Sequence, residues 1–278
     1  MPTRTLQKSD HLEDAAAPVN RASVNAGVAL LIMGVISGFS YLFAVKGLIT
    51  SGNAVKTAKD ISAHESLFRI GYLGLFLVAV LDVIVAWVLF RVFAPVNRTI
   101  ALVAAWLRTA YAAIFVVAIN QLTKVPSLLR PLGGSAGVGT SQSRIEVLHR
   151  IDAYNNIWNV GLIVFGLYLL VLARLAYRSG FVPRLVSVLI GIAGFGYLVD
   201  SFTALSIRAS ETPLSSVSAL GEIVFALWLV IRGRRITLHS VSNRADSNPD
   251  AREEGHLTSS IQSPNSTTPV SAGPTASK

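Results

Sequence analysis

One stretch constrains this chain more than any other: residues 65–99, ESLFRIGYLGLFLVAVLDVIVAWVLFRVFAPVNRT. Its centre, from Ile70 to Phe90, is apolar over about the length of helix that crosses a bilayer, apart from Asp82 near the middle. A carboxylate in hydrocarbon costs roughly 3 kcal/mol, so Asp82 needs a partner on a neighbouring helix. The stretch therefore predicts a membrane-spanning helix that belongs to a bundle.

The composition favours a membrane protein over a soluble domain. Hydrophobic residues make up 52% of the chain and charged residues 14%, whereas soluble domains carry about 25% charged residues. The net charge of +9 comes from arginines at the ends of apolar runs, so contacts with anionic lipid headgroups fit better than nucleic acid. The absence of cysteine excludes disulfides and cysteine metal sites, and we expect no cofactor.

Six apolar segments predict one all-α integral membrane bundle within residues 23–235. Residues 1–22 and the Ser/Thr/Pro-rich residues 236–278 have a composition that cannot bury enough apolar surface, so we expect two disordered tails. The six transmembrane helices are expected at about 26–45, 67–93, 99–120, 153–177, 182–205 and 213–231.

Two connections are expected to be loops, at residues 51–63 and 121–150. The longer one holds a glycine cluster at residues 133–139, but no strand precedes it, so a phosphate-binding loop is not indicated. The five histidines are scattered without metal-ligand spacing, so neither a metal site nor a catalytic motif is predicted.

Basic residues in the short turns predict the orientation, because such residues stay on the cytoplasmic side. The turns after the second and fourth predicted helices carry Arg91, Arg98, Arg174, Arg178 and Arg184. With six helices, both termini then lie in the cytoplasm. We expect a multi-pass protein of the cytoplasmic membrane with anionic lipid headgroups as partners at that face.

Asp82 and Arg108 are expected to form an intramembrane ion pair. The second and third predicted helices form an antiparallel hairpin, which puts both residues roughly 12–16 Å from the shared turn. Arg108 also shares a helical face with small residues that suit inward packing, including Ala104 and Ala112. The pair would either fix helix register or serve as a gate or proton site.

Other polar residues gather in the half of the membrane away from the basic turns. If their helix faces converge, they would line an outward-facing pocket; if not, they form interhelical hydrogen bonds and headgroup contacts. The candidate ligand-binding residues are Glu65, Arg69, His149, Asn155, Asn159, Asp200 and Glu222.

Several segments resemble one family of bacterial and archaeal membrane proteins, domain of unknown function 4386, over roughly residues 22–235. The resemblance rests on Glu65-Ser-Leu-Phe-Arg69, Val96-Asn-Arg98, Arg108, residues 157–167 and 177–184, Gly194-Phe-Gly-Tyr-Leu-Val-Asp200, Gly221-Glu222 and residues 227–233. The resemblance implies a helical membrane fold without naming a substrate. It nominates Glu65, Arg69, Arg108, Asp200 and Glu222.

Three classes of function remain open. The first is a sensor or small transporter that binds a small polar or amphipathic ligand, or a proton, in the outward-facing pocket. The second is an intramembrane enzyme with Glu222 or His149 as general base, which would need these residues and Asp200 within about 10 Å of one another. The third is a structural or assembly protein without a ligand. The sequence indicates no particular ligand and no oligomeric state.

Overall fold

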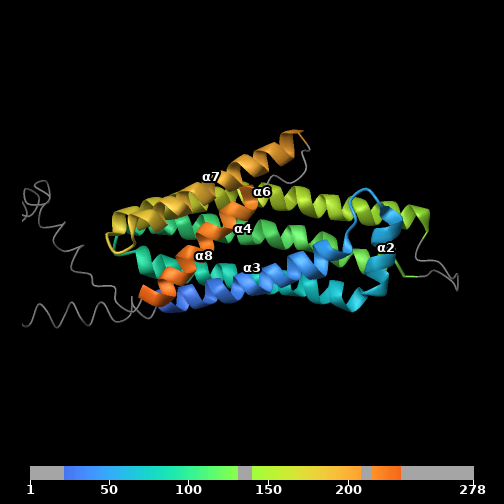
Figure 1. Ribbon diagram of the computed structural model, residues 1–278, viewed down its shortest axis with the longest axis horizontal. Helices are drawn as coiled ribbons and strands as arrows, with labels where there is room; N and C mark the ends of the chain where they lie inside the picture. The colour runs from blue at the N-terminus through green and yellow to red at the C-terminus, as the bar shows by residue number, and fades with distance from the viewer. Residues whose placement is uncertain (1–21, 131–139, 208–213, 233–278) are drawn as a thin grey trace, which may run out of the picture. The chain divides into compact units, whose positions relative to one another are not determined.

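The computed structural model describes residues 22–130, 140–207 and 214–232, with the side chains of 207 and 214–220 left out of the description. Throughout these ranges the regular structure is helical, and no strand occurs in them (Figure 1). Apart from Ala22, the predicted tails lie outside the described residues. Residues 133–139, which hold the glycine cluster, lie outside them as well.

Five of the described helices are long and apolar enough to cross a membrane. They are the first span, Ala22–Leu48, then α3 (Glu65–Phe93), α4 (Arg98–Thr123), α6 (Ser141–Ser179) and α7 (Arg184–Ile207). The helix predicted last corresponds to α8, Leu214–Arg232. An all-helical membrane fold is thus confirmed, while the count of six spans and the orientation of the termini stay predictions.

The first span changes its winding before it ends. It continues as a π-helix, η1 (Phe39–Val45), and a single 3₁₀ turn, η2 (Lys46–Leu48). The segment that follows was expected to be a loop, but residues 54–63 form the short helix α2, Ala54–Ala63. Asn53 caps it by accepting the Lys56 N–H at 2.9 Å, and Ile61 lies on its buried face. That loop prediction was wrong because it weighed polarity rather than helical spacing.

The long loop expected at 121–150 is shorter than predicted. A short helix, α5 (Val125–Leu128), follows α4, and α6 already begins at Ser141. Thr140 caps α6 by accepting the Ser143 N–H at 3.2 Å. With 39 residues, α6 is about 58 Å long, nearly twice the hydrocarbon thickness of a bilayer. Its first turns therefore extend past the membrane core.

The helices pack in chain order, each against the next, as α3, α4, α6, α7 and α8, and the first span packs on α3. The closest approach of α6 and α7 is at Gly166 and Gly194, where a Cβ on either residue would lie 2.8 Å from the other's carbonyl oxygen. A Cβ on Gly27 would lie 2.8 Å from the Ala226 carbonyl oxygen of α8. This contact joins α8 to the first span and closes the ring of helices.

Candidate functional site

Asp82 of α3 and Arg108 of α4 lie against each other in the interior of the bundle. Arg108 Nη2 is 2.6 Å from Asp82 Oδ1, and the two side chains are only 1% and 3% exposed. Their helices form a hairpin whose second helix starts at Asn97, which accepts the Ile100 N–H at 2.9 Å. The hairpin brings together the two residues that the sequence places at equal depth.

Arg108 also contacts the first span and α6. Its Nη1 donates to Tyr168 Oη at 2.8 Å, and its Nη2 lies 4.0 Å from Met33 Sδ. The guanidinium carbon is 5.0 Å from the ring centre of Tyr168 and 5.6 Å from that of Phe165, which are cation–π distances. Arg108 Nε has no hydrogen-bond partner within the described residues. The guanidinium is thus held by three helices besides its own, with one of its nitrogens, Nε, left without a partner among the described residues.

Glu222 brings a second carboxylate toward this guanidinium from α8. Tyr197 Oη, on α7, donates to Glu222 Oε1 at 3.0 Å, and the Tyr197 ring packs edge-on against Phe165 at 5.6 Å. Arg108 feels the charge of Glu222 as well as that of Asp82. The first span, α3, α4, α6, α7 and α8 therefore all contribute to one group, the central cluster: Met33, Asp82, Arg108, Phe165, Tyr168, Tyr197 and Glu222.

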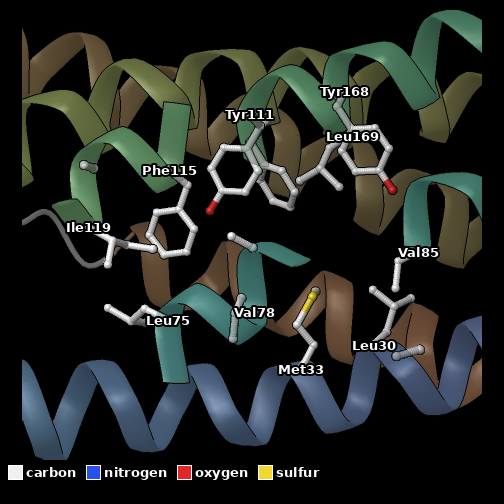
Figure 2. Close-up of a cluster of buried hydrophobic side chains, with 14 of the residues drawn as sticks. Leu30, Met33, Leu75, Val78, Val85, Tyr111, Phe115, Ile119, Tyr168 and Leu169 are labelled. Carbon is white, nitrogen blue, oxygen red and sulfur yellow. The ribbon is translucent and has the colours of Figure 1, made fainter. Parts of the chain in front are cut away.

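Aromatic rings fill the interior on the side of the cluster away from the α3–α4 turn. Tyr111 packs on Phe165 at 4.7 Å and on Phe115 at 5.7 Å, and Phe115 packs on Trp158 at 6.0 Å. Figure 2 shows the rings of Tyr111 and Phe115 next to each other in this buried core. A Cβ on Gly161 would lie 3.4 Å from the Tyr111 ring, so the absence of a side chain there makes room for it.

A small cavity lies on the other side of the cluster, toward the α3–α4 turn. Its volume is about 10 Å³, close to the space that the centre of one water molecule needs. Its walls come from α3, α4 and α6: Ala86, Leu89, Phe90, Phe93, Ala101, Ala104, Ala105, Tyr168, Leu172 and Leu175. Tyr168 belongs both to this wall and to the central cluster.

The remaining candidate residues do not gather with Glu222. Glu65 and Arg69 pair with each other in the first turn of α3, where both are partly exposed. His149 is 70% exposed and is 3.9 Å from Glu146 of its own helix. It precedes Phe165 by 16 residues, which is about 24 Å along α6. A pocket that joins these residues to Glu222 is therefore not formed by the described side chains.

The other three candidates lie on α6 and α7. Asn155 is exposed and Asn159 half-buried, both on the stretch of α6 between His149 and the cluster. Asp200 follows Tyr197 by almost one turn of α7, is half-buried and interacts electrostatically with Tyr197. The structure thus places Asp200 beside the cluster and leaves Asn155 on the surface.

The aromatic members of the cluster were not predicted as site residues. Tyr154, Trp158, Phe165 and Tyr168 recur on α6 at intervals of four, seven and three residues, which is the spacing of one helix face. Arg108 and Tyr111 are likewise three residues apart on α4. An aromatic stripe aligned with a buried arginine is the signal that could have found Phe165 and Tyr168.

Comparisons with known proteins identify a family for this chain but no function. The family model described as "Domain of unknown function (DUF4386)" matches residues 25–233. A relative from Archaeoglobus fulgidus, described as "Uncharacterized protein", is 32% identical over 164 residues, which cover 59% of this chain and 84% of the relative. No solved structure matches the chain.

Proposed function

The chain belongs to the DUF4386 family, and we propose that it is an integral membrane protein that binds a proton at Glu222, as part of a sensor or a small transporter. One observation carries the proposal. Among the described residues, Glu222 has no cationic partner of its own, because the guanidinium nearby already pairs with Asp82 at 2.6 Å and the hydrogen bond that Glu222 accepts, at 3.0 Å, comes from the neutral hydroxyl of Tyr197.

The charges of the central cluster favour proton uptake. With every group ionised, two carboxylates face one guanidinium, and a net negative charge in hydrocarbon is costly. A proton on Glu222 leaves a neutral cluster in which the Asp82–Arg108 pair is kept. The titratable groups that face Glu222 electrostatically or pack around it are Tyr197 and Asp200 of α7, Arg108 and Tyr111 of α4, Asp82 of α3 and Tyr168 of α6.

The space beside the cluster also supports a proton over a larger ligand. Sites for small organic molecules usually measure about 300–1,000 Å³. The cavity next to Tyr168 offers about 10 Å³, which suits water and protons. A proton needs no preformed pocket.

Membrane location and lipid contacts are part of the same proposal. Residues 91–98 and 174–184 contain five arginines and no carboxylate. Short turns of this kind favour the cytoplasmic face of the cytoplasmic membrane, where anionic headgroups would contact the arginines. Both termini would then be cytoplasmic if α8 completes six spans.

A structural role is the second candidate, because the contacts of Arg108 favour it. Two of its three nitrogens are hydrogen-bonded within the bundle, as expected of a residue that only fixes helix register. The enzyme alternative has less support. Because His149 stands about 24 Å along α6 from the level of Phe165, it is beyond the reach needed for shared acid–base chemistry with Glu222.

The pH dependence of stability in Glu222→Gln tests the proposal. If folded protein holds a proton on Glu222 that the unfolded chain releases, stability falls as pH rises, by up to about 1.4 kcal/mol per pH unit. Glutamine is neutral at every pH, so the variant should lack this slope. The measurement is unfolding by sodium dodecyl sulfate in mixed micelles, from about pH 5 to about pH 8, followed by circular dichroism.

Glu146→Gln provides the control, because Glu146 is a partly exposed carboxylate on α6 that pairs with Arg150. This variant should keep the wild-type slope. Parallel pH profiles for wild type and Glu222→Gln would refute proton binding and leave Glu222 as an interhelical contact.

A further inference from the structure

The cavity beside the central cluster extends toward one end of the bundle. On α3 its wall begins at Ala86, beyond Asp82, and on α4 it spans Ala101 to Ala105, ahead of Arg108. On α6 it runs from Tyr168 to Leu175. All three segments lead from the cluster to the end where α3 turns into α4.

One residue of the cluster, Tyr168, lines this cavity, and Arg108 donates a hydrogen bond to its hydroxyl. Side chains on a helix lean toward its N-terminus, so Arg108 leans over Ala104 and Ala105, which both line the cavity. Arg108 is 1% exposed, and its Nε has no partner among the described residues. A buried donor without a partner is costly unless water reaches it.

The opposite side of the cluster is packed with side chains. Tyr111 contacts Phe165 at 4.7 Å, and Phe115 continues the stack to Trp158 at 6.0 Å. These rings occupy the interior between the cluster and the end where α3 begins. The cavity at the α3–α4 end is thus a space beside the cluster that is large enough for one water.

We propose that water enters through this cavity and reaches Arg108 and Tyr168 from the α3–α4 end of the bundle. One water there accepts the Arg108 Nε–H and hydrogen-bonds to Tyr168 Oη, which gives it the two polar partners that a buried water needs. This inference rests on the proposed proton binding at Glu222 and adds the end of the bundle from which water enters. A proton that Glu222 takes up then comes from this side of the bundle.

The entry side differs from the one that the sequence suggested. The predicted pocket opened outward, among residues such as Glu65 and His149. With the orientation favoured by the basic turns, the α3–α4 end is cytoplasmic. The cluster would then exchange protons with the cytoplasm.

Cysteine accessibility tests the inference, and the native chain has no cysteine to interfere. Ala101→Cys and Ala104→Cys place a thiol in the cavity wall, at sites that are 1% and 5% exposed. The controls are Ala112→Cys and Ala118→Cys, equally buried at 2% and 0% but on the far side of Arg108 along α4. The probe is hydrogen peroxide, a hydrophilic oxidant little larger than water, on purified protein in detergent, with mass spectrometry of the oxidised thiols as the labelling readout.

The cavity variants should react at least about tenfold faster than the controls, a difference of about 1.4 kcal/mol in the free energy of access. Ala86→Cys, on α3, repeats the test from the other wall in case an α4 variant fails to fold. Equal rates at all five positions would overturn the inference, provided that every thiol reacts after denaturation. Reaction with N-ethylmaleimide but not with hydrogen peroxide would also overturn it, because access to the thiols would then run through apolar space rather than through water.

The same labelling in Glu222→Gln separates this inference from the proposed function. Water access depends on the cavity and should persist in that variant. Parallel pH profiles for wild type and Glu222→Gln, together with preferential labelling of the cavity, would refute proton binding and keep the water entry. A pH slope that wild type shows and Glu222→Gln lacks, together with no preferential labelling, would keep proton binding and refute the water entry.

Discussion

Asp82→Asn should be the most informative single substitution, because it removes one charge from a buried pair and leaves the other. Arg108 Nη2 lies 2.6 Å from Asp82 Oδ1, and neither side chain has more than 3% of its surface exposed. Truncating one partner of such a pair costs about 3–5 kcal/mol, because the remaining charge is buried without compensation. Tyr168 and the rings around Arg108 offer no negative charge in place of Asp82, and Glu222 offers none while it holds a proton, so the assay is run at about pH 5, the acidic end of the range above.

The measurement is the free energy of unfolding by sodium dodecyl sulfate in mixed micelles, with Glu146→Gln as control. Glu146 pairs with Arg150 at 2.8 Å, but the side chains are 36% and 40% exposed. Exposed pairs four residues apart on a helix contribute about 0.5 kcal/mol or less. Both variants remove the carboxylate from a carboxylate–arginine pair. The pairs differ in burial, because Asp82–Arg108 is buried and Glu146–Arg150 is partly exposed.

A double variant separates a missing charge partner from a general packing defect. Asp82→Leu with Arg108→Met replaces the pair by apolar side chains and leaves only Tyr168 Oη short of a partner, at about 1–3 kcal/mol. It should unfold closer to wild type than Asp82→Asn does. A cost below about 1 kcal/mol for Asp82→Asn, or a double variant as unstable as the sum of its single variants, would refute the reasoning.

Two further predictions concern packing and topology. Gly194→Ala should destabilise the bundle by about 1–3 kcal/mol in the same assay, because its Cβ would lie 2.8 Å from the Gly166 carbonyl oxygen. Gly34→Ala is the control, since nothing lies within 4 Å of its Cβ, and it should not destabilise; equal losses would contradict the packing argument. In intact cells, an impermeant maleimide should label Ser51→Cys and spare Pro95→Cys until lysis, because both positions are exposed and the proposed orientation puts the connection before α2 outside and the α3–α4 turn inside. The reverse pattern would invert the proposed orientation.

The helices that face lipid were predictable from sequence because hydrocarbon imposes a long apolar run. The structure begins α3 and α4 at Glu65 and Arg98, within two residues of the prediction. Outside the hydrocarbon, a helix needs no long apolar run, so this rule predicts nothing there. There α2 forms from an amphipathic spacing, and the start of α6 from a cap at Thr140, so both were taken for loops.

The candidate site was predictable only where two residues share one hairpin. Equal distance from a turn put Asp82 beside Arg108 without any knowledge of how the other helices pack. The contact between Tyr197 and Glu222 depends on α8 lying between α7 and the first span. That order is set by close approaches at small residues, such as Gly27 against Ala226, and hydropathy carries no information about them.

The positions of the polar residues explain why the sequence analysis placed the candidate site in the outer half of the membrane. His149 and Asn155 are exposed on a helix about 58 Å long, much of which outruns the hydrocarbon, so water and headgroups can satisfy them. The polar partners of Asp82, Arg108 and Glu222 are mainly one another and a few phenol hydroxyls. A buried charge is therefore a better guide to the site than a high density of polar residues, because only the buried charge must be balanced inside the protein. With every group ionised this bundle would be one cation short, and the proposed proton on Glu222 would supply it.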